Sequence, residues 1–165
     1  LNKNINGKIL FNIDSLKGIK FFNKAKISLS ILNEKLILND SIFISNKIGN
    51  MILKDCSLEI VDNEKIVKLK ILLDILNEKK FYQKIQIPKS SRIKLKNVYI
   101  ELEKNLNRDE INIYKFLVNK KDFTSSTDKE IDLTEQIDVD QLNNIKNWIE
   151  LKKYSAELLS EIKKT

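Results

Sequence analysis

The clearest pattern along the chain is a strict alternation of apolar and polar residues. Between residues 24 and 31, Ala25, Ile27, Leu29 and Ile31 alternate with lysines and serines, which is the period of a half-buried β-strand. Further strand-like segments occupy residues 5–13, 35–44, 92–103 and 110–118 and flank a turn near residue 63. About seven such segments recur roughly every ten residues. The pattern therefore predicts a mainly β fold with a meandering, curved antiparallel sheet.

The tripeptide Asn-Glu-Lys occurs three times, and its first copy predicts a hairpin turn. A two-residue turn at Asn33-Glu34 pairs Ile31 with Leu36, because Asn tolerates positive φ. The same register pairs Leu29 with Leu38 and Ala25 with Ile42, which gathers apolar residues on one face. Asp40 then falls opposite Ile27, a misfit that we interpret as a β-bulge.

The second copy predicts another hairpin, with its turn at Asn63-Glu64. This turn pairs Ile60 with Val67. The same register pairs Leu58 with Leu69 and Cys56 with Ile71. On the opposite face, Glu59 and Lys68 form a charge pair that contributes roughly a few tenths of a kcal/mol.

Helical spacing replaces the alternation in two places. At the third copy, Asn77 predicts the N-cap of a short helix near residues 78–87, which Pro88 ends. Residues 139–164 predict a long amphipathic helix capped by Asp138 or Asp140. Its apolar stripe consists of Leu142, Ile145, Ile149, Leu159 and Ile162. The chain thus divides into a β domain (1–121), an acidic linker (122–138) and a C-terminal helix (139–164).

The charge of the chain is unevenly distributed. Its formal net charge is +7, but residues 1–121 hold 24 Lys and Arg against 13 Asp and Glu, a net of +11. Residues 122–165 hold 6 against 10, a net of −4. A basic body can attract nucleic acid or anionic lipid headgroups. However, Lys, Ile and Asn are all abundant in the chain, which indicates a compositional bias rather than a selected basic surface. Only two of the basic residues are Arg, the type favoured for specific phosphate recognition. The composition therefore argues against nucleic acid as a partner.

Residues that carry chemistry are scarce. The chain has no His, which removes the commonest general base and metal ligand. Cys56 falls on an apolar strand face, where we expect a buried structural thiol rather than a nucleophile. Three glycines do not form a phosphate-binding loop. Glu101 and Glu103 share a strand face, which one polar side of a strand explains. We therefore expect a protein that is not an enzyme and has no metal or cofactor.

The apolar surface of the strands is more unusual than the polar residues. Residues 65–76 read KIVKLKILLDIL, which places an aliphatic residue at every odd position from 67 to 75 on one face. A sheet must cover such a face with a second sheet, a helix, a partner or lipid. The expected sheet is accordingly either an open groove or sandwich-like.

Two long stretches of the chain resemble a known family. Residues 48–75 read IGNMILKDCSLEIVDNEKIVKLKILLDI, and residues 79–121 read KKFYQKIQIPKSSRIKLKNVYIELEKNLNRDEINIYKFLVNKK. The strand entered through Ile48-Gly49, the hairpin, the short helix around Phe81-Tyr82 and the strand INIYKF resemble the C-terminal region of AsmA-like proteins. The resemblance covers roughly residues 5–121 and rests on hydrophobic patterns. It carries no catalytic residues.

The resemblance implies a non-catalytic segment of an envelope protein of Gram-negative bacteria. Such proteins build an apolar β-groove for phospholipid transfer between the inner and outer membranes, or for outer-membrane assembly. Phospholipid acyl chains would be the ligand. The expected location is the periplasm, with a tether to the inner membrane in another part of the parent chain, since no apolar run here reaches the roughly 20 residues of a membrane span. The start at Leu1 also suggests a piece of a larger protein.

Ten residues are candidates for the lining of this groove. They are Ile27, Leu29, Ile31, Leu36, Leu38, Leu58, Ile60, Val67, Leu69 and Ile71. For each of them, a position in a closed sandwich core is an equally good interpretation. A different function is also open, namely a structural or protein-interaction module that docks through a sheet edge or through the C-terminal helix.

Overall fold

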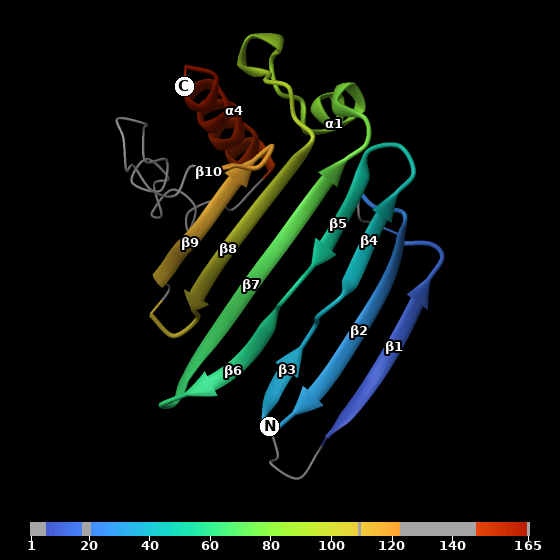
Figure 1. Ribbon diagram of the computed structural model, residues 1–165, viewed down its shortest axis with the longest axis vertical. Helices are drawn as coiled ribbons and strands as arrows, with labels where there is room; N and C mark the ends of the chain where they lie inside the picture. The colour runs from blue at the N-terminus through green and yellow to red at the C-terminus, as the bar shows by residue number, and fades with distance from the viewer. Residues whose placement is uncertain (1–5, 18–20, 109, 123–147, 165) are drawn as a thin grey trace.

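A computed structural model describes residues 6–17, 21–108, 110–122 and 148–164, which form one antiparallel sheet with helices at one end (Figure 1). The ten strands are β1 (Gly7–Ile13), β2 (Lys24–Leu32), β3 (Lys35–Ile37), β4 (Ser41–Ser45), β5 (Gly49–Leu53), β6 (Ser57–Val61), β7 (Glu64–Ile75), β8 (Asn97–Asn105), β9 (Glu110–Val118) and β10 (Lys121–Asp122). The helices are α1 (Glu78–Ile85), the 3₁₀ turn η1 (Lys89–Ser91) and α4 (Trp148–Lys164). The mainly β, antiparallel prediction is confirmed.

The described residues form ten strands, not about seven. Two of the expected strands are each broken in two, so β3 and β4 together occupy the place beside β2, and β5 and β6 that beside β7. The two-residue β10 adds another strand at the edge beyond β9. Strand β10 also extends the sheet to Asp122, one residue past the expected domain boundary.

The two breaks lie side by side. Asp40 has a φ of 58°, which turns the chain between β3 and β4, and its N–H donates to the Leu53 carbonyl at 2.8 Å. The Asn39 side chain accepts from the Cys56 N–H at 2.8 Å and so joins this break to the one between β5 and β6. Ser30 pairs with Ile37, whereas Lys26 pairs with Ile42, a register shift of one residue. The expected irregularity at Asp40 is present, and the expected pairing of Ala25 with Ile42 is therefore wrong.

The first turn lies where the sequence predicts it, and the second does not. Asn33 and Glu34 both have positive φ, and Ile31 pairs with Leu36 as expected. The second turn is formed by residues 62 and 63, also with positive φ, instead of residues 63 and 64. Leu58 consequently pairs with Val67 rather than with Leu69, and Ile60 pairs with Lys65 rather than with Val67. This slip of two residues leaves the side chains of β6 and β7 on their expected faces, because side chains alternate with a period of two, but Cys56 lies before β6 and does not pair with Ile71.

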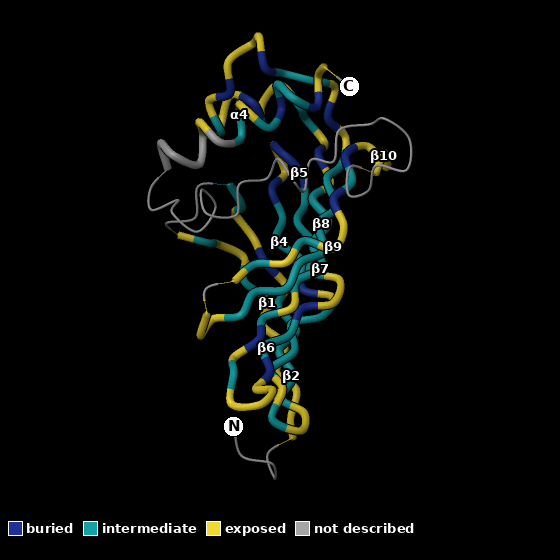
Figure 2. The backbone as a smooth tube through the Cα atoms, turned by 90° about the vertical axis from the view of Figure 1, so that its left-hand side faces the viewer, coloured by how far each residue is buried: buried dark blue, intermediate teal, exposed yellow. Residues whose placement is uncertain are grey.

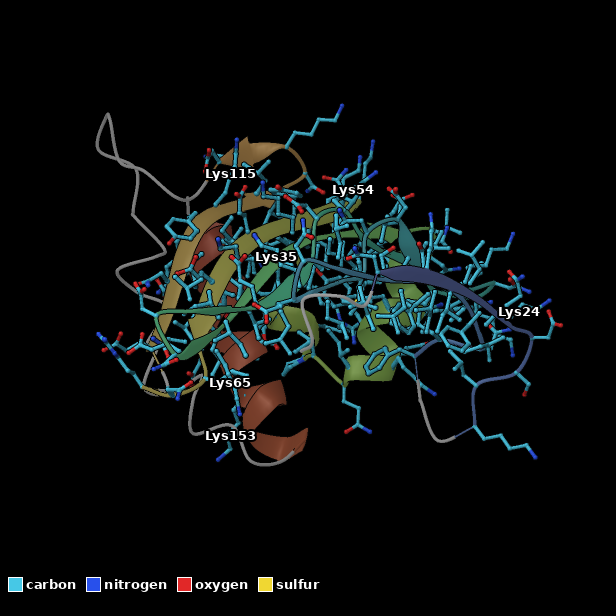
Figure 3. The ribbon with its side chains drawn as sticks, turned by 90° about the horizontal axis from the view of Figure 1, so that it is seen from below. Lys24, Lys35, Lys54, Lys65, Lys115 and Lys153 are labelled. Carbon is cyan, nitrogen blue, oxygen red and sulfur yellow. The ribbon has the colours of Figure 1, made fainter. Side chains whose placement is uncertain are left out.

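Cross-strand pairing assigns the strand residues to two faces, which we call the inner and outer faces. The inner face carries Ile9, Phe11, Ile13, Ala25, Ile27, Leu29, Ile31, Leu36, Phe43, Met51, Leu53, Leu58, Ile60, Val67, Leu69, Ile71, Leu73, Ile75, Val98, Ile100, Leu102, Ile111, Ile113, Phe116 and Val118. Seen from below, the sheet curves towards the side on which α1 and α4 lie (Figure 3). That concave side is the inner face, since both helices pack on its residues.

The outer face is more polar and is crossed by ion pairs. The buried Glu59 carboxylate contacts Lys35 and Lys68, and Lys70 lies 3.3 Å from both Asp55 and Glu101. One apolar stripe runs across five neighbouring strands of this face through Ile42, Ile52, Leu72, Tyr99 and Leu117. Glu101 also accepts a hydrogen bond from the Tyr99 hydroxyl at 3.1 Å. The outer face therefore combines ion pairs with a single apolar stripe.

The helices that the structure describes cover one end of the inner face. Asn77 caps α1 as expected by accepting from the Lys80 N–H at 2.9 Å. Tyr82 is 1% exposed and donates to the Ile93 carbonyl at 2.9 Å. The buried cluster consists of Ile75, Tyr82, Ile87, Leu95, Phe116, Val118, Leu159 and Ile162. Helix α4 thus docks on the ends of β7 to β9 and on η1, where Ser160 contacts Ser91 at 2.9 Å.

The expected linker and the start of the last helix fall mostly outside the described residues. Residues 123–147 are not described, and these include the candidate caps Asp138 and Asp140 and the stripe residues Leu142 and Ile145. The described part of the helix, α4, runs from Trp148.

Candidate functional site

The candidate site is the part of the inner face that the helices leave open. Figure 2 shows the helices gathered at one end of the sheet, with the strands extending well beyond them. Few inner-face residues outside the helix-covered end are fully buried, and Ala25, at 1% exposure, is the apolar one. Most of the others are half-buried, and Ile9, Phe11 and Ile60 are 52%, 43% and 52% exposed. A face inside a sandwich would bury these side chains, so the described strands form a single layer here.

Nine of the ten candidate lining residues lie on this inner face. They are Ile27, Leu29, Ile31, Leu36, Leu58, Ile60, Val67, Leu69 and Ile71. Leu38 instead lies in the break between β3 and β4, where its N–H donates to the Cys56 carbonyl at 2.8 Å. The structure therefore brings the nine onto one surface that crosses β2, β3, β6 and β7.

The curvature and register explain why one surface results. Residues directly opposite one another in an antiparallel pair project to the same side of the sheet. The pairs Ile31 with Leu36, Leu36 with Leu58 and Leu58 with Val67 connect four strands in an unbroken row. The row continues from Val67 to Lys104 on β8 and then to Ile111 on β9, so one lysine interrupts it. Branched aliphatic side chains in such a row present methyl groups and no hydrogen-bonding groups.

A pocket of about 600 Å³ lies at the helix-covered end of the sheet, beside α1. Leu16, Phe21 and Phe22 from the connection between β1 and β2 line one part of it, together with Ile48 from the β4–β5 turn. The rings of Phe22 and Phe43 lie 5.9 Å apart, and Phe43 belongs to the inner face. The pocket therefore continues the apolar inner face at its upper end.

The sequence interpretation missed this pocket. Residues 14–23 show neither alternation nor helical spacing, so nothing marked Leu16 or the Phe21-Phe22 pair as part of a site. Two adjacent aromatic residues in a loop indicate that the loop packs against another part of the protein. Phe21 and Phe22 were therefore the signal in the sequence that could have revealed this pocket.

Two titratable groups in the described part of the chain, Cys56 and Tyr82, are buried and have raised pKa values. Cys56 is 1% exposed, as expected for a structural thiol, and burial raises its pKa. Burial likewise raises the pKa of Tyr82, whose hydroxyl is engaged with Ile93. Glu101 and Glu103 lie on the outer face, where Glu101 pairs with Lys70. Within residues 6–122 and 148–164, apart from the gaps named above, no three His, Cys, Asp or Glu side chains cluster as metal ligands would.

The helices of the described segments are too short or too polar to cross a membrane. Comparisons of the chain with protein-family models, with curated proteins and with solved structures found no match.

Proposed function

We propose that this chain is a non-catalytic lipid-binding segment whose open inner face holds phospholipid acyl chains. The observation that carries the proposal is a mostly apolar face on a single-layer sheet, which is half-buried or exposed outside the helix-covered end and is interrupted by Lys65 and Lys104. Exposed apolar surfaces of this extent on a protein mark a site for another apolar molecule.

The dimensions of the face suit an acyl chain. Strand β7 has 12 residues and so extends for about 40 Å at roughly 3.3 Å per residue. One leaflet of a bilayer core is about 15 Å thick, half of the roughly 30 Å of the whole core. A single acyl chain therefore fits along the strands with room at both ends.

The energetics give a moderate affinity, as a transfer protein requires. Full burial of one CH₂ contributes about 0.8 kcal/mol, and an open face covers about half of each group. A chain of about 14 CH₂ groups then gains about 6 kcal/mol of gross binding free energy, which the loss of translational and rotational freedom on association reduces. The second chain of the same lipid adds a similar gross gain without a second loss of that freedom.

The resemblance to AsmA-like proteins supports a more specific proposal. In it, the segment belongs to a longer apolar groove in the periplasm that is tethered to the inner membrane, and lipid moves along the groove between the membranes. The supporting features are a curved antiparallel sheet and a concave apolar face (Figure 3). Cell fractionation of the full-length protein tests this location: recovery in the cytosolic fraction would contradict it.

Site-specific photo-crosslinking tests the groove directly. A photo-reactive amino acid at Leu29 or Leu69, on the inner face, should capture phospholipid in cells. The matched positions Lys26 and Lys115 lie on the outer face and should not. Figure 3 shows Lys115 on the convex side. Equal capture from both faces, or none from Leu29 and Leu69, would reject the groove.

A charge on the inner face provides a second test with a matched control. Leu29→Glu should abolish lipid capture at Leu69, because an unpaired charge is costly beside acyl chains. Ser30→Glu places the same charge one residue away on the outer face and should leave capture unchanged. Leu29 is half-buried rather than enclosed, so the variant should keep the circular dichroism spectrum of the parent. Unchanged capture in a folded Leu29→Glu variant would contradict the proposal.

A second candidate function is docking through the edge strand β1. Among the described strands, β1 pairs only with β2, and Ile9, Leu10 and Phe11 are 52%, 67% and 43% exposed. An exposed apolar edge is a template for a strand from another chain. Sedimentation of the purified chain with and without Ile9→Lys tests it: the variant should dissociate any assembly formed through this edge.

A further inference from the structure

The upper pocket combines an apolar wall with a cluster of lysines. Three elements meet there: the β1–β2 connection, the β4–β5 turn and α1 (Figure 1). Leu16, Phe21, Phe22 and Ile48 supply the apolar wall. The remaining lining includes Lys47 from the turn and Lys80 and Lys84 from α1. Such a composition suits an amphiphile, with a tail on one side and a charged group on the other.

The three lysines line one pocket, and no neutralising group is found for them among the residues that the structure describes. Lys80 and Lys84 are four residues apart on α1 and therefore lie on the same side of the helix, where like charges repel. In the part of the chain that the structure describes, no carboxylate lies within ion-pair distance of Lys47, Lys80 or Lys84. The nearby Glu78 carboxylate is occupied elsewhere, since it accepts from the Leu95 N–H at 3.0 Å. A local excess of positive charge favours an anionic ligand.

The pocket is continuous with the proposed acyl-chain surface. Phe22 contacts Phe43, and Phe43 pairs with Met51 on the inner face. From Met51 the inner face continues to Leu73 on β7. A molecule with its charged group at the lysines would thus have its apolar part directed onto this face.

We propose that the pocket binds the phosphate of an anionic phospholipid headgroup while the acyl chains lie on the inner face. The inference rests on the proposed lipid-binding function and adds an orientation and a headgroup preference to it. The lysines bind the phosphate as flexible point charges, so they select for negative charge rather than for one headgroup shape. Gln83, which also lines the pocket, supplies an uncharged donor for the polar part of the headgroup.

The test uses the full chain and two short-chain lipids below their micellar concentrations. Calorimetry should show that dioctanoyl phosphatidylglycerol, which is anionic, binds about tenfold tighter than zwitterionic dioctanoyl phosphatidylcholine. The reason is that each nearby lysine adds favourable electrostatic free energy to the binding of an anionic lipid. The triple variant Lys47→Gln, Lys80→Gln, Lys84→Gln should lose this preference and retain the weaker phosphatidylcholine binding.

A control variant with the same change in net charge separates the pocket from general electrostatics. Lys8→Gln, Lys26→Gln, Lys115→Gln removes three lysines of the outer face and should leave the tenfold preference intact. The same loss in both triple variants would overturn the headgroup site and implicate net charge alone.

The remaining outcomes distinguish the headgroup site from the groove. If both lipids bind wild-type protein equally well, the headgroup site is wrong and the apolar groove stands. If deacylated glycerophosphoglycerol binds as tightly as the intact lipid, the pocket is a free-anion site and the inference is overturned. If neither lipid binds, the proposed function fails and the headgroup site fails with it.

Discussion

The buried carboxylate of Glu59 should stabilise the sheet through two lysines from neighbouring strands. Its side chain is 5% exposed, and it contacts Lys35 on β3 and Lys68 on β7, the latter at 2.6 Å. Glu59 itself belongs to β6, so the cluster joins three strands beside the breaks in the sheet. The sequence predicts the contact between Glu59 and Lys68, and the structure confirms it, although the two residues are diagonal rather than directly opposite.

The magnitude follows from the exposure of the partners. A hydrogen bond to a charged group contributes about 1.5–3 kcal/mol. Both lysine side chains are about half exposed, at 52% and 50%, so water screens each contact. We therefore expect about 1 kcal/mol per contact and about 2 kcal/mol for the loss of both contacts in Glu59→Gln. For a chain of this size, that loss lowers Tm by about 4–8 °C.

The pH dependence gives the sharper test. The hydrogen bond from Lys35, followed by that from Lys68, lowers the pKa of Glu59 below its ordinary value of about 4.3. The folded state therefore binds the Glu59 proton less readily than the unfolded state does. The stabilisation is fully present above the unfolded pKa and is lost as pH falls through the folded pKa.

The Tm difference between wild type and Glu59→Gln should consequently be constant from pH 7 to about pH 5.5 and should shrink progressively as the pH falls below about 4. Glu110→Gln is the matched control, because Glu110 is exposed on the same outer face, and it should melt like wild type throughout. A Tm difference as large at pH 3 as at pH 7 would show that the side chain stabilises by shape rather than by charge. No difference at pH 7 would refute the cluster altogether.

Three further predictions follow from the packing. Gly49→Ala should lower the free energy of unfolding by more than about 2 kcal/mol in chemical denaturation, because φ is +148° and a Cβ would lie 2.0 Å from a carbonyl oxygen on β7. Gly7 has open space around it, so the control variant Gly7→Ala should leave the free energy of unfolding unchanged. Equal effects of the two substitutions would contradict this prediction. Leu159→Ala with Ile162→Ala should remove about 2 kcal/mol per side chain and increase the fluorescence of a hydrophobic dye by uncovering the upper inner face; unchanged dye binding would show that α4 does not shield it. Cys56 should react with iodoacetamide at pH 8 far more slowly in the folded than in the unfolded protein, since burial raises its pKa, and equal rates would mean that the thiol is accessible.

The alternation of residue types was sufficient to predict the faces of the sheet but not its strand count. Period-two patterning depends only on local geometry, so Leu29 and Leu69 could be assigned to a common face before the sheet was known. The predicted position of the second turn was wrong because Asp62 and Asn63 tolerate positive φ as well as Asn63 and Glu64 do. Pairing with the rest of the sheet places the turn at Asp62 and Asn63, and a local residue pattern carries no information about that pairing.

The sequence predicted one of the two breaks in the sheet and not the other. Asp40 stood out as a charged residue opposite an isoleucine, and it does adopt positive φ there. The matching break between β5 and β6 had no such sign. It depends on the Asn39 side chain and the Cys56 N–H, which lie 17 residues apart in the chain and meet only when β3 and β6 are paired. Long-range hydrogen bonds of this kind cannot be read from local residue patterns.

Whether the inner face is a groove or a sandwich core depends on how many elements the chain has left to cover it. Apolar alternation is the same in both cases, so the sequence could not decide between them. The described strands from Gly7 to Asp122 all join one sheet, which leaves α1, η1 and α4 as the described elements available to pack on it. These reach only the upper end, around Ile75 and Phe116. The outer face supplies its own stabilisation through ion pairs and one apolar stripe, so the sheet does not need a second layer along its whole length. A sheet that its outer face stabilises, and that helices cover at one end, can leave the rest of its concave face open to a ligand. This is the physical basis of the proposed groove.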